Sequence, residues 1–88
     1  MTWEVKRTAT FIESLRAIRK NKEALFELDK KIKRLQEDPL HLGGWLSGEL
    51  HGKKSTRIAN KYLLIFTLDE KEKIVYLIWI DHRKSAYD

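Results

Sequence analysis

The chain contains no cysteine, so disulfide bonds and thiolate metal sites are excluded, and this absence is typical of a protein of the reducing cytoplasm. Its three histidines (His41, His51 and His82) are not spaced as metal ligands. The apolar runs are too short to span a membrane, and strand-like residues stand where a signal peptide would begin. We therefore expect a cytoplasmic protein that uses no metal, no cofactor and no membrane.

Proline and glycine are also scarce, with one proline and four glycines among 88 residues, and no linker or low-complexity segment interrupts the chain. We expect a single domain, 1–88, with a thin core, because a chain of this length buries only roughly 60–65% of its unfolded surface. The formal net charge of +5 favours a polyanionic partner. Charges of both signs alternate over 22–34, as on a solvated helix face, whereas the segment 53–61 carries only cations: Lys53, Lys54, Arg57 and Lys61.

Helical patterns dominate the segment from residue 10 to residue 38. Thr10 and Glu13 form a capping-box pattern, which predicts that a first helix starts there. Its apolar face would carry Phe11, Leu15 and Ile18, with Ile12 beside them. After a turn at 20–22, a second helix is expected to end at Asp38-Pro39, because the residue before a proline disfavours the helical region. Its apolar stripe consists of Leu25, Leu28, Ile32 and Leu35.

Strand patterns dominate the rest of the chain. Gly43-Gly44 should break the chain, with Trp45 anchoring the loop that follows. We expect a short strand at 49–51 and longer ones at 54–58, 62–68 and 74–80, joined by tight turns. With a first strand at 3–6, the order is β-α-α-β-β-β. The fold class is therefore α+β, with an antiparallel sheet packed on an N-terminal helical hairpin.

The two longest strands are apolar at odd and even positions alike, so both faces of the sheet are apolar. Two helices can cover one face. We expect the other face to be covered by a curled sheet edge, a second copy or a partner chain, because an exposed apolar face on a small protein usually marks an interaction site.

Residues suited to phosphate chemistry follow the last strand, namely His82, Arg83 and Tyr87. In an antiparallel meander this strand end lies near Arg57 and Lys61, with Lys54 further along the same surface. An imidazole can take or give a proton near neutral pH, and guanidinium or ammonium groups can stabilise a charged phosphate. Each signal is weak alone, because a lone histidine is more often structural and a basic tail is often frayed.

The chain resembles the RelE/ParE toxin superfamily over nearly its whole length. The resemblance rests on the element order, on Leu50-His51-Gly52, on the strand start 61–66 and on the ending 82–87, of the form H-R-x-x-x-Y. It implies a RelE-like fold and the toxin of a type II toxin–antitoxin system. The implied activity is that of an mRNA interferase, a ribosome-dependent endoribonuclease that inhibits translation. The implied partners are the ribosome, mRNA and a RelB-like antitoxin.

The resemblance also implies roles for single residues. Arg57 falls where the family places a catalytic basic residue, His82 or Arg83 where it has an arginine or a histidine, and Tyr87 matches a C-terminal tyrosine. The expected roles are proton transfer by His82, phosphate stabilisation by Arg57 and Arg83, and base stacking or proton relay by Tyr87. RNA-binding contacts are expected from Lys53, Lys54, Lys61 and Lys84.

One departure from the family pattern is the pair Tyr62-Leu63, where RelE toxins usually have Tyr-Arg. Without that arginine, we expect the reaction to depend mainly on His82, since the resemblance to the YafQ branch implies a mechanism that relies on histidines. Two alternatives stay open: a ParE-like toxin that binds DNA gyrase without cutting RNA, and a toxin homologue that has lost activity, with Leu63 as the lesion. All three predict an antitoxin whose acidic amphipathic segment lies along the apolar sheet face or displaces the C-terminal tail.

Overall fold

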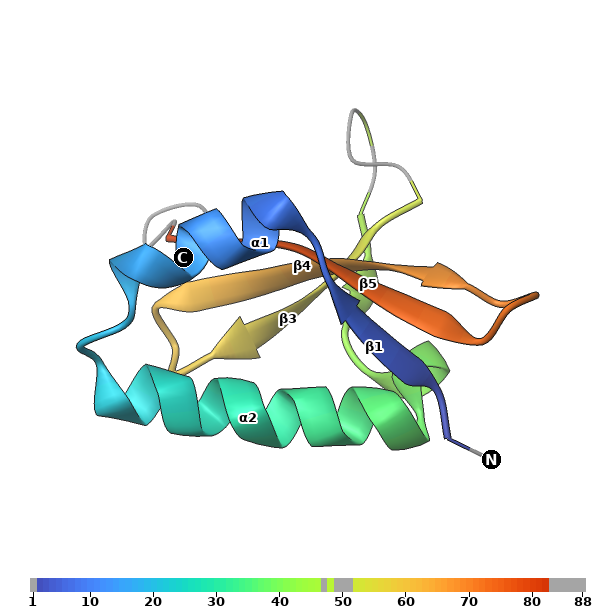
Figure 1. Cartoon of the computed structure of the whole chain (residues 1–88), viewed down its shortest axis with the longest axis horizontal. Helices are drawn as coiled ribbons and strands as arrows, with labels where there is room; N and C mark the ends of the chain where they lie inside the picture. The colour runs from blue at the N-terminus through green and yellow to red at the C-terminus, as the bar shows by residue number, and fades with distance from the viewer. Residues whose placement is uncertain (1, 47, 49–51, 83–88) are drawn as a thin grey trace.

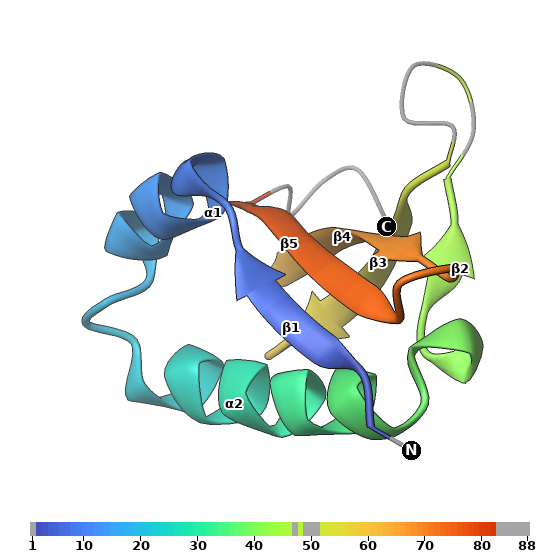
Figure 2. The ribbon, with the colours of Figure 1, turned by 45° about the vertical axis from the view of Figure 1, so that its right-hand side comes forward.

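A computed structural model of the chain describes residues 2–46, 48 and 52–82 and confirms the α+β class. Its described strands form one sheet in the order β1-β5-β4-β3-β2 (Figures 1 and 2). The strands are β1 (Glu4–Arg7), β2 (Gly44–Trp45), β3 (Lys54–Ile58), β4 (Tyr62–Asp69) and β5 (Ile74–Asp81). The α-helices are α1 (Ala9–Ser14) and α2 (Lys22–Glu37), and the 3-10 helices are η1 (Leu15–Ala17) and η2 (Pro39–His41).

The sheet is mixed, so the expectation of a wholly antiparallel sheet is wrong for one pair. The hairpins β3–β4 and β4–β5 are antiparallel as predicted, but β1 pairs with β5 in parallel. A parallel pair needs a long connection, and the helices and the other strands supply it between β1 and β5. The short strand β2 was not predicted. It pairs with β3 where Gly43, at φ +74°, lies so close to the Ser55 carbonyl that a Cβ would clash.

Helix α1 starts two residues earlier than the capping box predicts. Its N-cap is Thr8, whose hydroxyl accepts a hydrogen bond from the Phe11 N–H at 3.2 Å. The same hydroxyl lies 2.7 Å from the Leu77 carbonyl oxygen in β5, to which it donates. Thr8 therefore joins the helix to strand β5, whereas Thr10 is exposed inside the first turn. Ile12, expected beside the apolar face, is 54% exposed because α1 is only six residues long and turns Phe11 inward.

We expect Thr8→Ala to lower the free energy of unfolding by about 1–2 kcal/mol, because it removes an N-cap and a bond between α1 and β5. Urea unfolding would measure the change. The matched control is Thr10→Ala, which should change stability by no more than a few tenths of a kcal/mol, since alanine is favoured inside a helix. A larger loss from Thr10→Ala than from Thr8→Ala would contradict the assignment of Thr8 as the cap.

Helix α2 has the extent and the apolar stripe that the sequence predicts. Asn21 caps it, with its side-chain oxygen accepting from the Ala24 N–H at 3.0 Å. Asp38, before Pro39, has φ −151° and ψ 72°, so the helix ends where the proline requires it. Its buried residues pack with those of α1 on one face of the sheet. The shared core includes Phe11, Ile18, Leu28, Leu35, Ile58, Leu64, Phe66, Val75, Leu77 and Ile80.

The opposite face of the sheet is less open than expected. Leu63 and Ile65 point away from the helix-side core and are nonetheless only 6% and 1% exposed in the single chain. Of the three covers expected for this face, neither a second copy nor a partner is needed at these two residues, because the chain covers them itself. Trp45, expected to anchor a loop, is 58% exposed. None of the described helices is long and apolar enough to cross a membrane.

Candidate functional site

Three strand ends meet at one end of the sheet, as the antiparallel meander predicts. Arg57 near the end of β3 pairs with Leu63 at the start of β4, and Leu63 pairs with Asp81 at the end of β5. These three residues form one row across the sheet. Figure 1 shows this end on the left, beside the last turn of α1. A hydrogen bond of 2.9 Å from the Ile80 N–H to the Ser14 hydroxyl ties β5 to α1 there.

His82 follows directly after this row, and its imidazole contacts an aromatic side chain. The centroids of the His82 and Tyr62 rings lie 4.8 Å apart, with 39° between the ring planes. Tyr62 is half-buried and packs against the helix-side core, whereas Leu63, the next residue, points to the opposite face. The imidazole therefore lies at the rim beside Tyr62 and outside the row of Arg57, Leu63 and Asp81.

Two members of this site, Asp81 and Tyr62, were not predicted from the sequence. Asp81 brings a carboxyl group into the row that contains Arg57, and each of these side chains has an interaction partner. Tyr62 was noted only as the residue before Leu63, and its ring contact with His82 had no sequence signal beyond its place opposite the end of β5. Cross-strand pairing puts Leu63 opposite Asp81, and the residues next to this pair are Tyr62 and His82. This pairing pattern would have identified both Asp81 and Tyr62.

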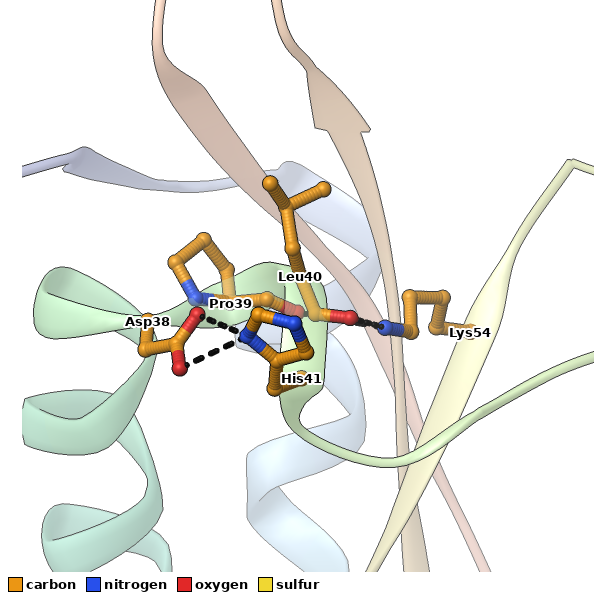
Figure 3. Close-up of polar contacts among 5 residues, drawn as sticks. All are labelled: Asp38, Pro39, Leu40, His41 and Lys54. Carbon is orange, nitrogen blue, oxygen red and sulfur yellow. Dashed lines mark hydrogen bonds and ion pairs between the residues drawn. The ribbon is translucent and has the colours of Figure 1, made fainter.

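Lys54 does not lie on the same surface as Arg57, and its assignment as an RNA contact is wrong. Residues 54, 56 and 58 of β3 are buried on the helix side, and Lys54 is only 1% exposed. Its ammonium donates hydrogen bonds to the carbonyl oxygens of Leu40 at 2.7 Å and Pro39 at 3.2 Å (Figure 3). It also lies 5.0 Å from the centroid of the Trp45 ring. Lys54 thus holds η2 and the Trp45 ring of β2 close to β3.

The surroundings of Lys54 change its ionisation. Burial lowers the pKa of the Lys54 ammonium from its ordinary 10.5, and the nearby Asp38 carboxylate partly offsets this shift. Asp38 in turn contacts His41 at 2.9 Å through both carboxylate oxygens (Figure 3). These groups cluster at the start of β3, whereas Arg57 and His82 lie near its other end.

The remaining predicted cations are spread along the same hairpin. Lys61 is exposed in the β3–β4 turn, next to Tyr62, and its N–H donates to the Ile58 carbonyl at 3.3 Å. Ala59 and Asn60 adopt positive φ in this turn, as the turn prediction requires. Lys53 is half-buried and precedes Arg57 by four residues, a separation of about 13 Å along an extended chain. Among the predicted cations that the structure describes, Arg57 and Lys61 are therefore the ones at the end of the sheet where β5 reaches His82.

Several predicted residues lie outside the described part of the chain. These are Arg83, Lys84 and Tyr87 of the predicted site, with Leu50 and His51 and the strand expected at 49–51. Their roles stay predictions. Among the described residues, no three His, Cys, Asp or Glu side chains gather as a metal site would require.

Comparison with known proteins yields matches among solved structures. No family model and no curated protein matches the chain. The RelBE2 toxin–antitoxin complex from Mycobacterium tuberculosis contains a chain 25% identical, with a TM-score of 0.73 over 94% of this chain and 100% of that one. The archaeal RelE–RelB complex from Pyrococcus horikoshii is 18% identical, with a TM-score of 0.74 over 98% and 100%. The DinJ–YafQ toxin–antitoxin complex from E. coli is 13% identical, with a TM-score of 0.75 over 100% of both chains.

These likenesses confirm the resemblance to the RelE/ParE toxin superfamily. They extend over 94–100% of this chain and over the whole of each matched chain. The part of the chain that the structure describes therefore has the RelE-like fold. Sequence identities of 13–25% establish a shared architecture. The chemistry has to be argued from the residues of the site, because proteins with the same fold can differ in function.

Proposed function

We propose that this protein is the toxin of a type II toxin–antitoxin system and cleaves mRNA on the ribosome. The observation that carries the proposal is the group at one end of a RelE-like sheet. His82 follows β5, Lys61 precedes the neighbouring strand β4, and Arg57 is on β3, one strand further across the sheet. A proton-transfer group beside cations is what cleavage of an RNA phosphodiester requires. The partners that follow are the ribosome, mRNA and a RelB-like antitoxin in the cytoplasm.

The proposed reaction is attack of a ribose 2′-oxygen on the adjacent 3′-phosphorus. The 2′-hydroxyl loses its proton to a base, a P–O bond to the 2′-oxygen forms, and the bond to the 5′-oxygen breaks as that oxygen gains a proton. The products are a 2′,3′-cyclic phosphate and a 5′-hydroxyl. His82 handles one of these two protons, and Arg57 stabilises the charge that accumulates on the phosphate oxygens. Lys61 contacts the RNA backbone, while Arg83 and Tyr87 keep the roles expected from the sequence.

Primer extension on an mRNA translated in a purified system tests this proposal. We expect new 5′ ends at codons in the ribosomal A site when the protein is present, and none when ribosomes are omitted. Pre-incubation with the cognate antitoxin should abolish the cuts. If the mRNA stays intact at toxin concentrations at which the protein still binds its antitoxin, the nuclease proposal is contradicted.

Loss of the Arg57 guanidinium should slow cleavage, because that group faces the developing charge. We expect Arg57→Ala to lower the cleavage rate by about 10²-fold, in the range found when one transition-state donor is removed. Arg57→Lys keeps the charge without the planar fork and should fall between the two. Lys33→Ala, on the exposed side of α2, is the control and should cleave like wild type. Equal rates for Arg57→Ala and wild type would remove Arg57 from the reaction.

A second candidate function is a toxin that binds its target without cutting RNA. Leu63 and Asp81 favour it, because an apolar residue and an acid share the row with Arg57, where a phosphate would prefer further cations. Inhibition of DNA gyrase supercoiling without any mRNA cleavage would support a ParE-like toxin. Binding of the antitoxin with neither activity would support a toxin homologue that has lost its chemistry.

A further inference from the structure

We infer that Tyr62 is a positioning residue that holds the His82 imidazole at the rim of the sheet. The inference rests on the proposed function, in which His82 transfers a proton. It starts from the contact of the two rings, 4.8 Å between centroids and tilted by 39°. Aromatic rings prefer offset-stacked or edge-to-face contacts with centroids about 4.5–7 Å apart. The distance here lies in that range, and the 39° tilt lies between the two arrangements.

The two rings differ in how firmly the fold holds them. Tyr62 is half-buried, packs against the helix-side core and pairs with Ile58, which is fully buried. His82 is exposed and follows the last residue of β5, so strand pairing does not fix its side chain. Within the described chain, the contact with Tyr62 is the side-chain interaction that the structure assigns to His82. A Tyr62 ring held by the core therefore restricts the rotamers of the exposed His82 imidazole.

Restriction matters because proton transfer depends on geometry. A catalytic base or acid must lie within hydrogen-bond distance of the atom that it serves, and a displacement of about 1 Å can cost about 10²-fold in rate. A histidine on a strand end without a neighbour would sample several rotamers, of which few would face the scissile phosphate. Tyr62 reduces that number without touching the RNA itself.

Two substitutions of Tyr62 separate its ring from its hydroxyl. Tyr62→Phe keeps the ring and should retain the wild-type cleavage rate within about twofold, because the His82 contact is made between rings. Tyr62→Ile keeps an apolar strand former without a ring, and should lower the cleavage rate at saturating ribosomes by about 10–100-fold. The ribosome concentration at half-saturation should not change. Tyr76→Ile, on a half-buried tyrosine elsewhere in β5, is the matched control.

Proton NMR of the free protein gives a second measurement that does not depend on cleavage. The ring current of Tyr62 should displace the Hδ2 and Hε1 resonances of His82 from random-coil positions in wild type and in Tyr62→Phe. In Tyr62→Ile these resonances should return to random-coil positions. The complementary variant, His82→Ala, alters an exposed residue and should shift the Tyr62 ring resonances, which keeps the test available if Tyr62→Ile unfolds.

The two measurements distinguish the possible failures. Random-coil His82 resonances in wild type, or Tyr62 resonances unmoved by His82→Ala, would overturn the contact. Wild-type cleavage by folded Tyr62→Ile would overturn the positioning role. A third outcome is that the wild-type protein cleaves no RNA while its His82 resonances are displaced only when residue 62 has a ring. In that case the proposed function fails, and the NMR result still supports the placement of His82 by Tyr62.

Discussion

His82→Ala should lower the rate of ribosome-dependent mRNA cleavage by about 10²–10⁴-fold, the contribution that a positioned acid or base makes to a reaction. The imidazole is exposed at the end of β5 and contacts Tyr62, and no described backbone group depends on it. The free energy of unfolding should therefore change by no more than about 1 kcal/mol. Primer extension with matched concentrations of folded wild type and variant would measure the loss.

His41→Ala is the control for this prediction. His41 is also an exposed histidine, but it belongs to η2, where it contacts Asp38 near the start of β3, away from the strand ends that carry His82. We expect it to cleave mRNA at the wild-type rate. If both His82→Ala and His41→Ala lose cleavage, the loss is not specific to His82. Wild-type cleavage by His82→Ala would remove His82 from the mechanism.

Lys54→Ala should be the most destabilising single substitution among the predicted site residues. It removes two hydrogen bonds from a charged donor, the contact with the Trp45 ring and the packing of a buried four-carbon stem. The carbonyl oxygens of Pro39 and Leu40 would lose this buried donor. We expect a loss of about 2–4 kcal/mol, which in a domain of this size lowers the melting temperature by about 10–25 °C.

The design of this experiment separates folding from RNA binding. Lys53→Ala changes a neighbouring cation that is half-buried and should cost less than about 0.5 kcal/mol. At a temperature where Lys54→Ala is fully folded, its cleavage rate should equal that of wild type, because Lys54 lies on the helix side of the sheet. A variant that is stable but weak in RNA binding would contradict the structural role.

The lowered pKa of Lys54 adds a pH dependence with a definite sign. Between the lowered folded-state pKa and 10.5, the unfolded chain binds more protons at this group than the folded protein does. The contribution of Lys54 to the free energy of unfolding therefore rises with pH through that window. Lys54→Met has no such group, so the stability of wild type relative to Lys54→Met should increase as the pH approaches 10.5. Urea unfolding of both proteins across this range measures the difference.

Local sequence patterns predicted most elements and few of the contacts that join them. The end of α2 at Asp38-Pro39 and the turn at Asn60-Lys61 follow from backbone preferences of a few neighbouring residues, and both predictions are confirmed. The capping box at Thr10 failed because the true cap, Thr8, also bonds to Leu77, 69 residues away. No local pattern contains that partner.

The candidate site shows the same division. Strand alternation and the meander predicted that Arg57 and Lys61 would lie at the end of β5, which the pairing of Arg57, Leu63 and Asp81 confirms for this end of the sheet. The sequence could not show that Lys54 faces the helix side, because a lone lysine in an alternating strand is normally assigned to solvent. Its acceptors lie 14 and 15 residues earlier in the chain.

The sequence by itself determined the α+β class, the order of the long elements, the hairpins and the choice of His82 and Arg57 as candidate residues, because these depend on periodicity, turn chemistry and residue type. Only the tertiary structure decided the parallel pairing of β1 with β5, the burial of Lys54, and the placement of His82 on Tyr62 outside the row of Arg57. The physical reason is that these features depend on side chains and strands that are distant in the chain and meet only when the core packs.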